Sequence, residues 1–81
     1  MYHVYILVSE RHQRLFIGLS NDPNRRLKEH NAGQVRSTKP YAPYKLVFSK
    51  KCASRKEARR IEKLFKTGCW RERINKFYLG L

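Results

Sequence analysis

Acidic residues are scarce in this sequence. Six Asp and Glu stand against 19 Lys and Arg, which leaves a formal net charge of +13 at pH 7. A surplus of this size repels itself in the folded chain, and a polyanionic partner is the simplest reason for a protein to carry it. The charge therefore predicts binding to a polyanion.

Cysteines and long apolar runs are also few. Cys52 and Cys69 form neither a disulfide framework nor a CxxC pair, and His3, His12 and His30 lie too scattered to complete a zinc site. We expect free thiols, no disulfide-linked partner and a reducing, cytoplasmic location. The first residues do not have the pattern of a signal peptide, and no run approaches the ~20 apolar residues of a transmembrane helix. Membrane attachment is therefore not expected.

Nothing in the chain marks a domain boundary. It has no linker, no repeat and no low-complexity tract, and its 81 residues suffice for one small core. Apolar residues make up 41 % of the chain, which is enough to fold. We therefore expect a single domain over residues 1–81.

Three apolar segments rich in β-branched and aromatic residues predict strands at 2–8, 15–19 and 44–49. The first has no polar alternation and is expected to be buried on both faces. A polar helix over 23–31 and two helices after residue 54 complete the order β-β-α-β-α-α. The sequence predicts an α+β fold, with a small, three-stranded, mainly antiparallel sheet flanked by helices.

Helix boundaries follow from capping signals. The run Asn21–Pro23 suits the start of the first helix, with Asn21 or Asp22 as the cap and Gly33 just beyond the end. Ser54 and Glu57 form a capping box for the second helix, which Gly68 is expected to end. The third helix is expected from the helical spacing of Trp70, Ile74, Phe77 and Tyr78.

Elimination among the carboxylates singles out Glu62. The others have ordinary interpretations as caps, loop residues or ion-pair partners: Asp22, Glu57, Glu10, Glu72, and Glu29 with Arg25. Glu62 falls about 40° from Ala58 around its helix, at the margin of the apolar face. Such a carboxylate forms a structural salt bridge or holds a metal, and the residue types alone favour a Glu–Arg bridge.

Four other residues have two interpretations each. Arg26 and His30 project from one helix face, where they suit phosphate binding and proton transfer, or form a solvated basic surface with an exposed histidine. Taken alone, the pair favours the solvated surface. Tyr5 is a core residue or extends its hydroxyl into a cleft. Gly18 marks a close approach or a β-bulge.

The loop at 34–43 mixes basic and aromatic side chains, which suits phosphate contact and base stacking, although its prolines would also serve to stiffen a connection. Thr38 and Tyr44 belong to the same mixture. The residues expected to contact nucleic acid are Arg25, Lys28, Arg36, Lys39 and Tyr41.

Four segments together resemble the GIY-YIG nuclease domain. Val4-Tyr5-Ile6 and Phe16-Ile17-Gly18 stand at its two three-residue motifs, NDPNRRLKEHN resembles its Arg helix, and SRKEARRIEKLFKTG resembles its Glu helix. The similarity covers essentially the whole chain and is closest to short bacterial proteins in which the domain stands alone. Each motif is weak, but four in order make the resemblance specific.

The resemblance implies a metal-dependent phosphodiester hydrolase. Glu62 would hold one divalent ion, Mg²⁺ or Mn²⁺, and Arg26 would stabilise charge on the phosphate. Tyr5 would activate or orient the attacking water, His30 would assist proton transfer, and Gly18 would keep its strand close to the site. DNA is the expected substrate, and RNA is a further expected partner.

The chain departs from the family pattern at Phe16, where the second motif normally begins with Tyr, and at Val4, where the first begins with Gly. Two functions follow from this departure. One is a small Mg²⁺-dependent DNA endonuclease, and the alternative is a catalytically vestigial DNA- or RNA-binding basic domain.

Overall fold

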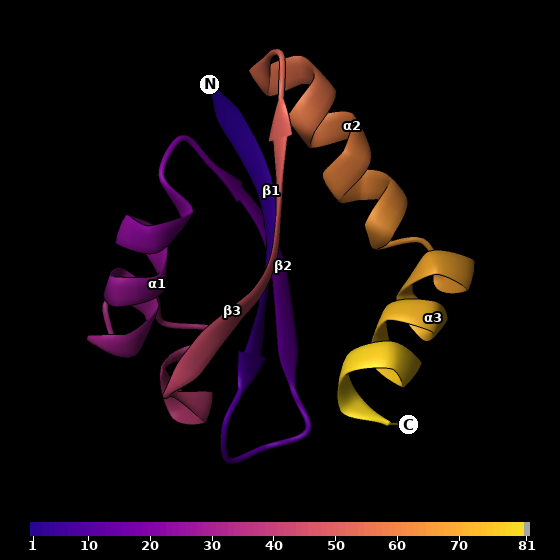
Figure 1. Ribbon diagram of the computed structural model, residues 1–81. Helices are drawn as coiled ribbons and strands as arrows, with labels where there is room; N and C mark the ends of the chain where they lie inside the picture. The colour runs from indigo at the N-terminus through magenta and orange to yellow at the C-terminus, as the bar shows by residue number, and fades with distance from the viewer. Residues whose placement is uncertain (81) are drawn as a thin grey trace.

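A three-stranded antiparallel sheet lies between helices that cover its two faces (Figure 1). The computed structural model describes residues 1–80, so Leu81, the last residue of the predicted single domain, lies outside the described residues. The elements are β1 (Tyr2–Ser9), β2 (Leu15–Ser20), α1 (Pro23–Asn31), the short 3₁₀ helix η1 (Lys39–Tyr41), β3 (Tyr44–Cys52), α2 (Arg55–Phe65) and α3 (Gly68–Leu79). The α+β class and the predicted order of elements are confirmed.

Strand β1 is the central strand, with β2 and β3 antiparallel on either side of it. Because successive side chains of a strand point to opposite faces, β1 contributes to two cores. Val4 and Ile6 pack toward α2 and α3, and Tyr5 and Leu7 pack toward α1. The prediction that this strand is buried on both faces is confirmed. Figure 1 shows α1 on one face of the sheet and α2 and α3 on the other.

The α2 and α3 side holds an apolar core that includes Ala58 and Ile74. Cys52 is buried in this core at the end of β3, and Cys69 is exposed. Both thiols are free, as expected. Strand β3 runs three residues beyond its predicted end. Helix α3 presents less of its apolar surface to the core than its helical spacing suggested, because Trp70 is 40 % and Phe77 is 79 % exposed. None of the helices within residues 1–80 has the length and apolar character to cross a membrane.

Two predicted caps are confirmed. The Asp22 carboxylate accepts a hydrogen bond from the Arg25 N–H at 3.1 Å, and the Ser54 hydroxyl accepts one from the Glu57 N–H at 3.2 Å. Each satisfies a backbone donor that the first turn leaves unpaired. Gly33, just beyond α1, has φ +77°, a conformation that favours glycine.

The expectation that Gly68 ends the second helix is wrong. Helix α2 ends at Phe65, and Gly68 is the first residue of α3. The Thr67 hydroxyl donates to the Leu64 carbonyl at 2.7 Å, and Thr67 itself is extended, so the chain changes direction without a left-handed residue. A glycine is therefore not needed to end α2.

Gly18 lies opposite Tyr5 in the β1–β2 register, and the Tyr5 ring crosses over it. A Cβ at Gly18 would lie 2.7 Å from the Phe16 Cε2 and 2.8 Å from the Tyr5 hydroxyl oxygen. The pairing is continuous from His3–Ser20 to Val8–Leu15, so the bulge interpretation is wrong and the close approach is confirmed. The register shift of the sheet lies instead between β1 and β3, at Ile6 and Leu7.

We expect Gly18→Ala to lower the free energy of unfolding by about 1–3 kcal/mol, since the added methyl group overpacks against two rings. Gly68→Ala is the matched control, because a Cβ there has no neighbour within 4 Å. That change should leave the stability equal or raise it by up to about 1 kcal/mol. Urea unfolding of both variants measures the difference, and equal stabilities would contradict the packing role of Gly18.

Candidate active site

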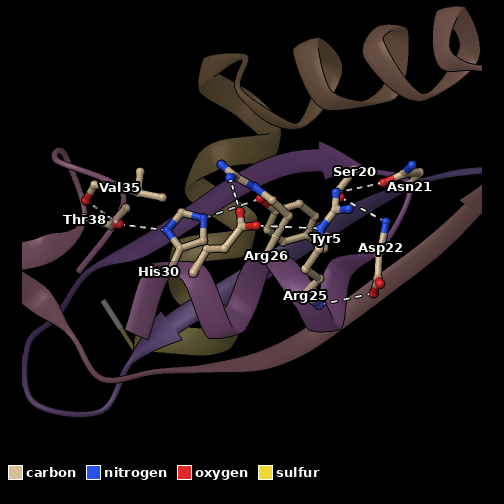
Figure 2. A network of polar contacts seen from close by, with 10 residues as sticks. Tyr5, Ser20, Asn21, Asp22, Arg25, Arg26, His30, Val35 and Thr38 are labelled. Atoms are coloured by element: carbon tan, nitrogen blue, oxygen red, sulfur yellow. Dashed lines mark hydrogen bonds and ion pairs between the residues drawn. The ribbon is translucent and has the colours of Figure 1, made fainter. Parts of the chain in front are cut away.

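Side chains from β1, α1 and α2 converge on the Tyr5 hydroxyl. His30 and Arg26 reach it from α1, and the charge of Glu62 acts on it from α2. Figure 2 shows the α1 part of this network, with His30 between Thr38 and Tyr5. The structure therefore places His30 and Arg26 beside Tyr5, with Glu62 near enough for its charge to act on the same hydroxyl.

His30 is fully buried, so the interpretation of an exposed histidine on a solvated helix is wrong. Its Nδ1 lies 2.7 Å from the Thr38 hydroxyl, and its Nε2 lies 3.5 Å from the Tyr5 hydroxyl. The Phe16 ring packs beside the imidazole at 4.7 Å between ring centres. The imidazole is thus enclosed by aromatic rings and held at both nitrogens.

The hydrogen-bond donors around His30 indicate which of its ring nitrogens carries the proton. The Thr38 hydroxyl has one hydrogen, and it donates to the Val35 carbonyl at 3.2 Å. With that hydrogen engaged, we assign the Nδ1–H of His30 as the donor to the Thr38 oxygen, which leaves the Nε2 lone pair facing the hydroxyl of Tyr5. The hydrogen bonds run in one direction, from Tyr5 through His30 to Thr38.

The electrostatic environment keeps His30 neutral. Burial lowers the pKa of His30 below its ordinary value, and the positive charge of Arg26 lowers it further. At pH 7 the imidazole therefore carries a free lone pair on Nε2, which is the state required of a proton acceptor.

Tyr5 keeps its proton at neutral pH. Burial raises the pKa of Tyr5, and this outweighs the opposing hydrogen bond and charge of Arg26; the carboxylates Glu62 and Glu29 raise it further. The phenol is thus not a standing base. Tyr5 is able to accept a proton from another group only if an acceptor such as His30 takes the phenol proton.

Arg26 lies at the entrance to this network, with its side chain 33 % exposed. Its Nη1 donates to Glu29 at 2.5 Å, whereas the predicted Arg25–Glu29 pair is longer, at 3.7 Å. Glu29 is therefore principally the partner of Arg26. A phosphate offers the same kind of oxygen acceptor to a guanidinium and is able to replace that carboxylate.

Glu62 forms an ion pair with Lys66 at 3.4 Å, not with the arginine that the residue types favoured. The lysine side chain is 46 % exposed, so the pair holds the carboxylate weakly. Within residues 1–80 no cluster of three or more His, Cys, Asp or Glu is arranged to hold a metal. This donor set fits Mg²⁺, which binds through one or two carboxylates, waters and substrate phosphates, and does not fit a closed zinc site.

The four cations expected to contact nucleic acid, Arg25, Lys28, Arg36 and Lys39, are all exposed. Tyr41 is different, because its ring is half-buried and covered. The Arg14 guanidinium lies 4.7 Å above the ring centre, and His12 packs edge-on at 5.4 Å. Tyr44 is 4 % exposed. The aromatic residues of this region therefore belong to the core beneath α1.

Sequence analysis missed the roles of Thr38 and Asn31. The Asn31 amide accepts from the Tyr44 N–H at 2.6 Å and donates to the Tyr44 carbonyl at 3.0 Å, which fixes the end of α1 to the start of β3. Neither role has a local signal beyond a polar residue near a helix end, because each partner comes from a different part of the fold.

We expect the free energy of unfolding to fall as the pH drops below about 6.5, because His30 then binds a proton in the unfolded chain but stays neutral in the folded state. The loss should continue down to the lowered pKa of His30 in the folded state. His30→Gln should flatten this part of the curve. Urea unfolding at stepped pH tests the slope, and an NMR titration that places the His30 pKa at or above its ordinary value would contradict it.

Comparisons with known proteins point to one family. The chain matches the family model of the GIY-YIG catalytic domain over residues 1–79. Two UPF0213 proteins of Streptococcus agalactiae, from serotype V and serotype III strains, are each 42 % identical to it over 53 residues, which is 64 % of this chain and 60 % of each relative. The match thus spans less than two thirds of these curated relatives.

The fold is also similar to a solved structure. The solution NMR structure of a UPF0213 protein from Bacillus halodurans is 28 % identical, with a TM-score of 0.53 over 98 % of this chain and 86 % of that chain. The family model covers all four motifs and all four residues around the Tyr5 hydroxyl. The chain therefore belongs to the GIY-YIG catalytic domain family, whose members are generally nucleases.

Proposed function

We propose that this protein is a cytoplasmic, divalent-metal-dependent endonuclease that hydrolyses phosphodiester bonds in DNA. The Tyr5–His30 hydrogen bond carries the proposal, with Arg26 beside the same hydroxyl and the charge of Glu62 acting on it. The net charge of +13 supports a nucleic-acid substrate.

Arg26 is the phosphate ligand of this site. It exchanges Glu29 for the non-bridging oxygens of the scissile phosphate, and it stabilises the charge that develops on them as the bond to phosphorus forms. When Arg26 turns to the phosphate, its hydrogen bond and its charge no longer lower the pKa of Tyr5, unless the guanidinium contacts the phosphate and the Tyr5 hydroxyl at the same time.

Tyr5 and His30 move the proton of the attacking water. The water oxygen bonds to phosphorus, its proton passes to the Tyr5 oxygen, and the Tyr5 proton passes to Nε2 of His30. The phosphorus–oxygen ester bond breaks, and the leaving oxygen takes a proton from solvent. Thr38 keeps Nε2 unprotonated beforehand by holding the proton of the imidazole on Nδ1.

Glu62 would hold the divalent ion, Mg²⁺ or Mn²⁺, together with waters and oxygens of the substrate phosphate. When bound, the ion supplies positive charge at the phosphate. Lys66 occupies this carboxylate through an exposed, long contact, which competes only weakly with a divalent cation.

Phe16 is the observation that favours the vestigial alternative, a DNA- or RNA-binding basic domain, because the tyrosine hydroxyl of the second motif is missing. Its ring still packs on His30 at 4.7 Å and lies 6.2 Å from the Tyr5 ring. The part of the motif that encloses the imidazole is thus retained, which supports an active site.

Glu62→Gln tests the metal role. We expect it to abolish Mg²⁺- or Mn²⁺-dependent cleavage and to change the free energy of unfolding by less than about 1 kcal/mol, since the Lys66 pair is exposed. Cleavage of labelled DNA with and without EDTA, beside a melting curve, measures both effects.

Lys66→Gln is the matched control, because it removes the same ion pair and leaves the carboxylate. It should still cleave. If both variants lose stability equally and both cleave, Glu62 is only a partner of Lys66 and the metal assignment fails.

Phe16→Tyr tests whether the missing hydroxyl limits the rate. Phe16 is half-buried and lines a surface hollow, so the variant should fold with unchanged stability. We expect single-turnover cleavage to rise by roughly tenfold, about 1.4 kcal/mol of barrier. Equal rates in two equally stable proteins would show that this position does not limit the reaction, and no cleavage by either would support the vestigial domain.

A further inference from the structure

A groove runs along the free edge of β2, beside the candidate active site. It consists of two shallow hollows of about 120 and 190 Å³. Leu15 and Arg71 line both hollows, so the two lie next to each other. The first also has Phe16, Ile17 and Lys66 in its lining, and the second has Gln13, Arg14, Asn75 and Leu79.

Two residues of the groove contact residues of the candidate active site. Phe16, which lines its first hollow, packs against His30, and Lys66, on the opposite wall, pairs with Glu62. A strand rises about 3.4 Å per residue, so Leu15 lies about 10 Å along β2 from Gly18, where the Tyr5 ring crosses. The hollows therefore lie along β2 from the candidate site, next to residues that contact it.

The groove is positively charged, and of its three cations only Lys66 is paired with an acid within the described residues. Its lining includes Arg14, Lys66 and Arg71 and no carboxylate. Among residues 1–80 the ion pairs are Arg25–Glu29, Arg26–Glu29 and Lys66–Glu62, so neither Arg14 nor Arg71 is paired with an acid. Arg71 is exposed and is available to a ligand.

The backbone of β2 contributes to the same surface. In the order β2-β1-β3 only β1 pairs with β2, so its outer edge has unpaired backbone groups. Backbone N–H groups at a sheet edge, next to arginines, favour anions. The side chains and the backbone of this edge therefore select the same kind of ligand.

We propose that this groove binds the nucleic-acid backbone next to the scissile phosphate, with Arg71 and Arg14 each contacting one phosphate of the strand. The proposal rests on the proposed function, because it takes the phosphate at Arg26 as the point of cleavage. A larger basic hollow on the outer face of α2 has Lys56 and Arg59 in its lining. It is less suited to this role, because its lining includes the carboxylate of Glu57, and because none of its residues packs on His30 or pairs with Glu62 as Phe16 and Lys66 of the groove do.

Salt dependence of binding tests the groove without any cleavage. Single-stranded DNA is titrated with protein in EDTA at several salt concentrations. Removing two phosphate contacts in Arg14→Gln/Arg71→Gln should reduce the slope of log K against log salt by about 1.4. Because Arg14 also packs on Tyr41, the single Arg71→Gln variant is measured beside it and should reduce the slope by about 0.7.

The matched control removes two exposed lysines from the opposite edge of the sheet. Lys45→Gln/Lys50→Gln, on β3, makes the same change in net charge and should leave the slope nearly unchanged. If the control lowers the slope as much as the groove variants do, binding is non-specific and the proposal fails. A loss confined to Lys56→Gln/Arg59→Gln would place the strand on α2 instead.

Cleavage with neutral linkages locates the contact. A methylphosphonate in place of one phosphate, next to the cut on one side, should slow wild-type single-turnover cleavage by about tenfold, and should slow Arg71→Gln no further. If the methylphosphonate slows Arg71→Gln by the same factor as it slows wild type, the two effects are independent and the proposal is overturned. If wild type does not cleave at all, the proposed function fails, whereas the salt slopes in EDTA still decide whether the groove binds the backbone.

Discussion

The position of the Tyr5 hydroxyl constrains the structure around it. Tyr5 lies in the central strand and is 1 % exposed, and its ring crosses β2 only because Gly18 has no Cβ. A buried hydroxyl without a partner costs about 1–3 kcal/mol, so groups able to hydrogen-bond must be held at the end of the ring. Helix α1 supplies them as His30 and Arg26, and Asn31 fixes that helix to β3.

Burial then sets the chemistry of the site. The same desolvation that lowers the pKa of His30 raises the pKa of Tyr5, so at neutral pH the phenol holds a proton and the imidazole is able to accept one. Two of the six acidic residues of the chain, Glu29 and Glu62, act on this hydroxyl. These two carboxylates thus act on the Tyr5 hydroxyl, whereas the hollows beside β2 have no carboxylate in their lining.

Local signals predicted much of the fold. The caps at Asp22 and Ser54 depend on neighbours within three residues of each cap. The continuous apolar run of β1 predicts that the strand is buried on both faces, as it is. The burial of His30 was not predicted, because α1 has only Leu27 as an apolar anchor, and a histidine three residues later gives no sign of the core beneath it. Gly68 failed as a boundary signal because Thr67 already closes the preceding turn with its own side chain.

The order of the elements follows from the sequence, and the resemblance of four short motifs to the family supplied the candidate set of Tyr5, Arg26, His30 and Glu62. Residue types and spacings alone favoured ordinary structural roles for these residues. The partner of each side chain follows from packing. His30 meets Tyr5 across 25 positions, Thr38 sets its tautomer from a loop, and Arg71 of α3 joins Arg14 beside β2. These contacts join different elements, and the seating of the helices against the two faces of the sheet determines which residues meet.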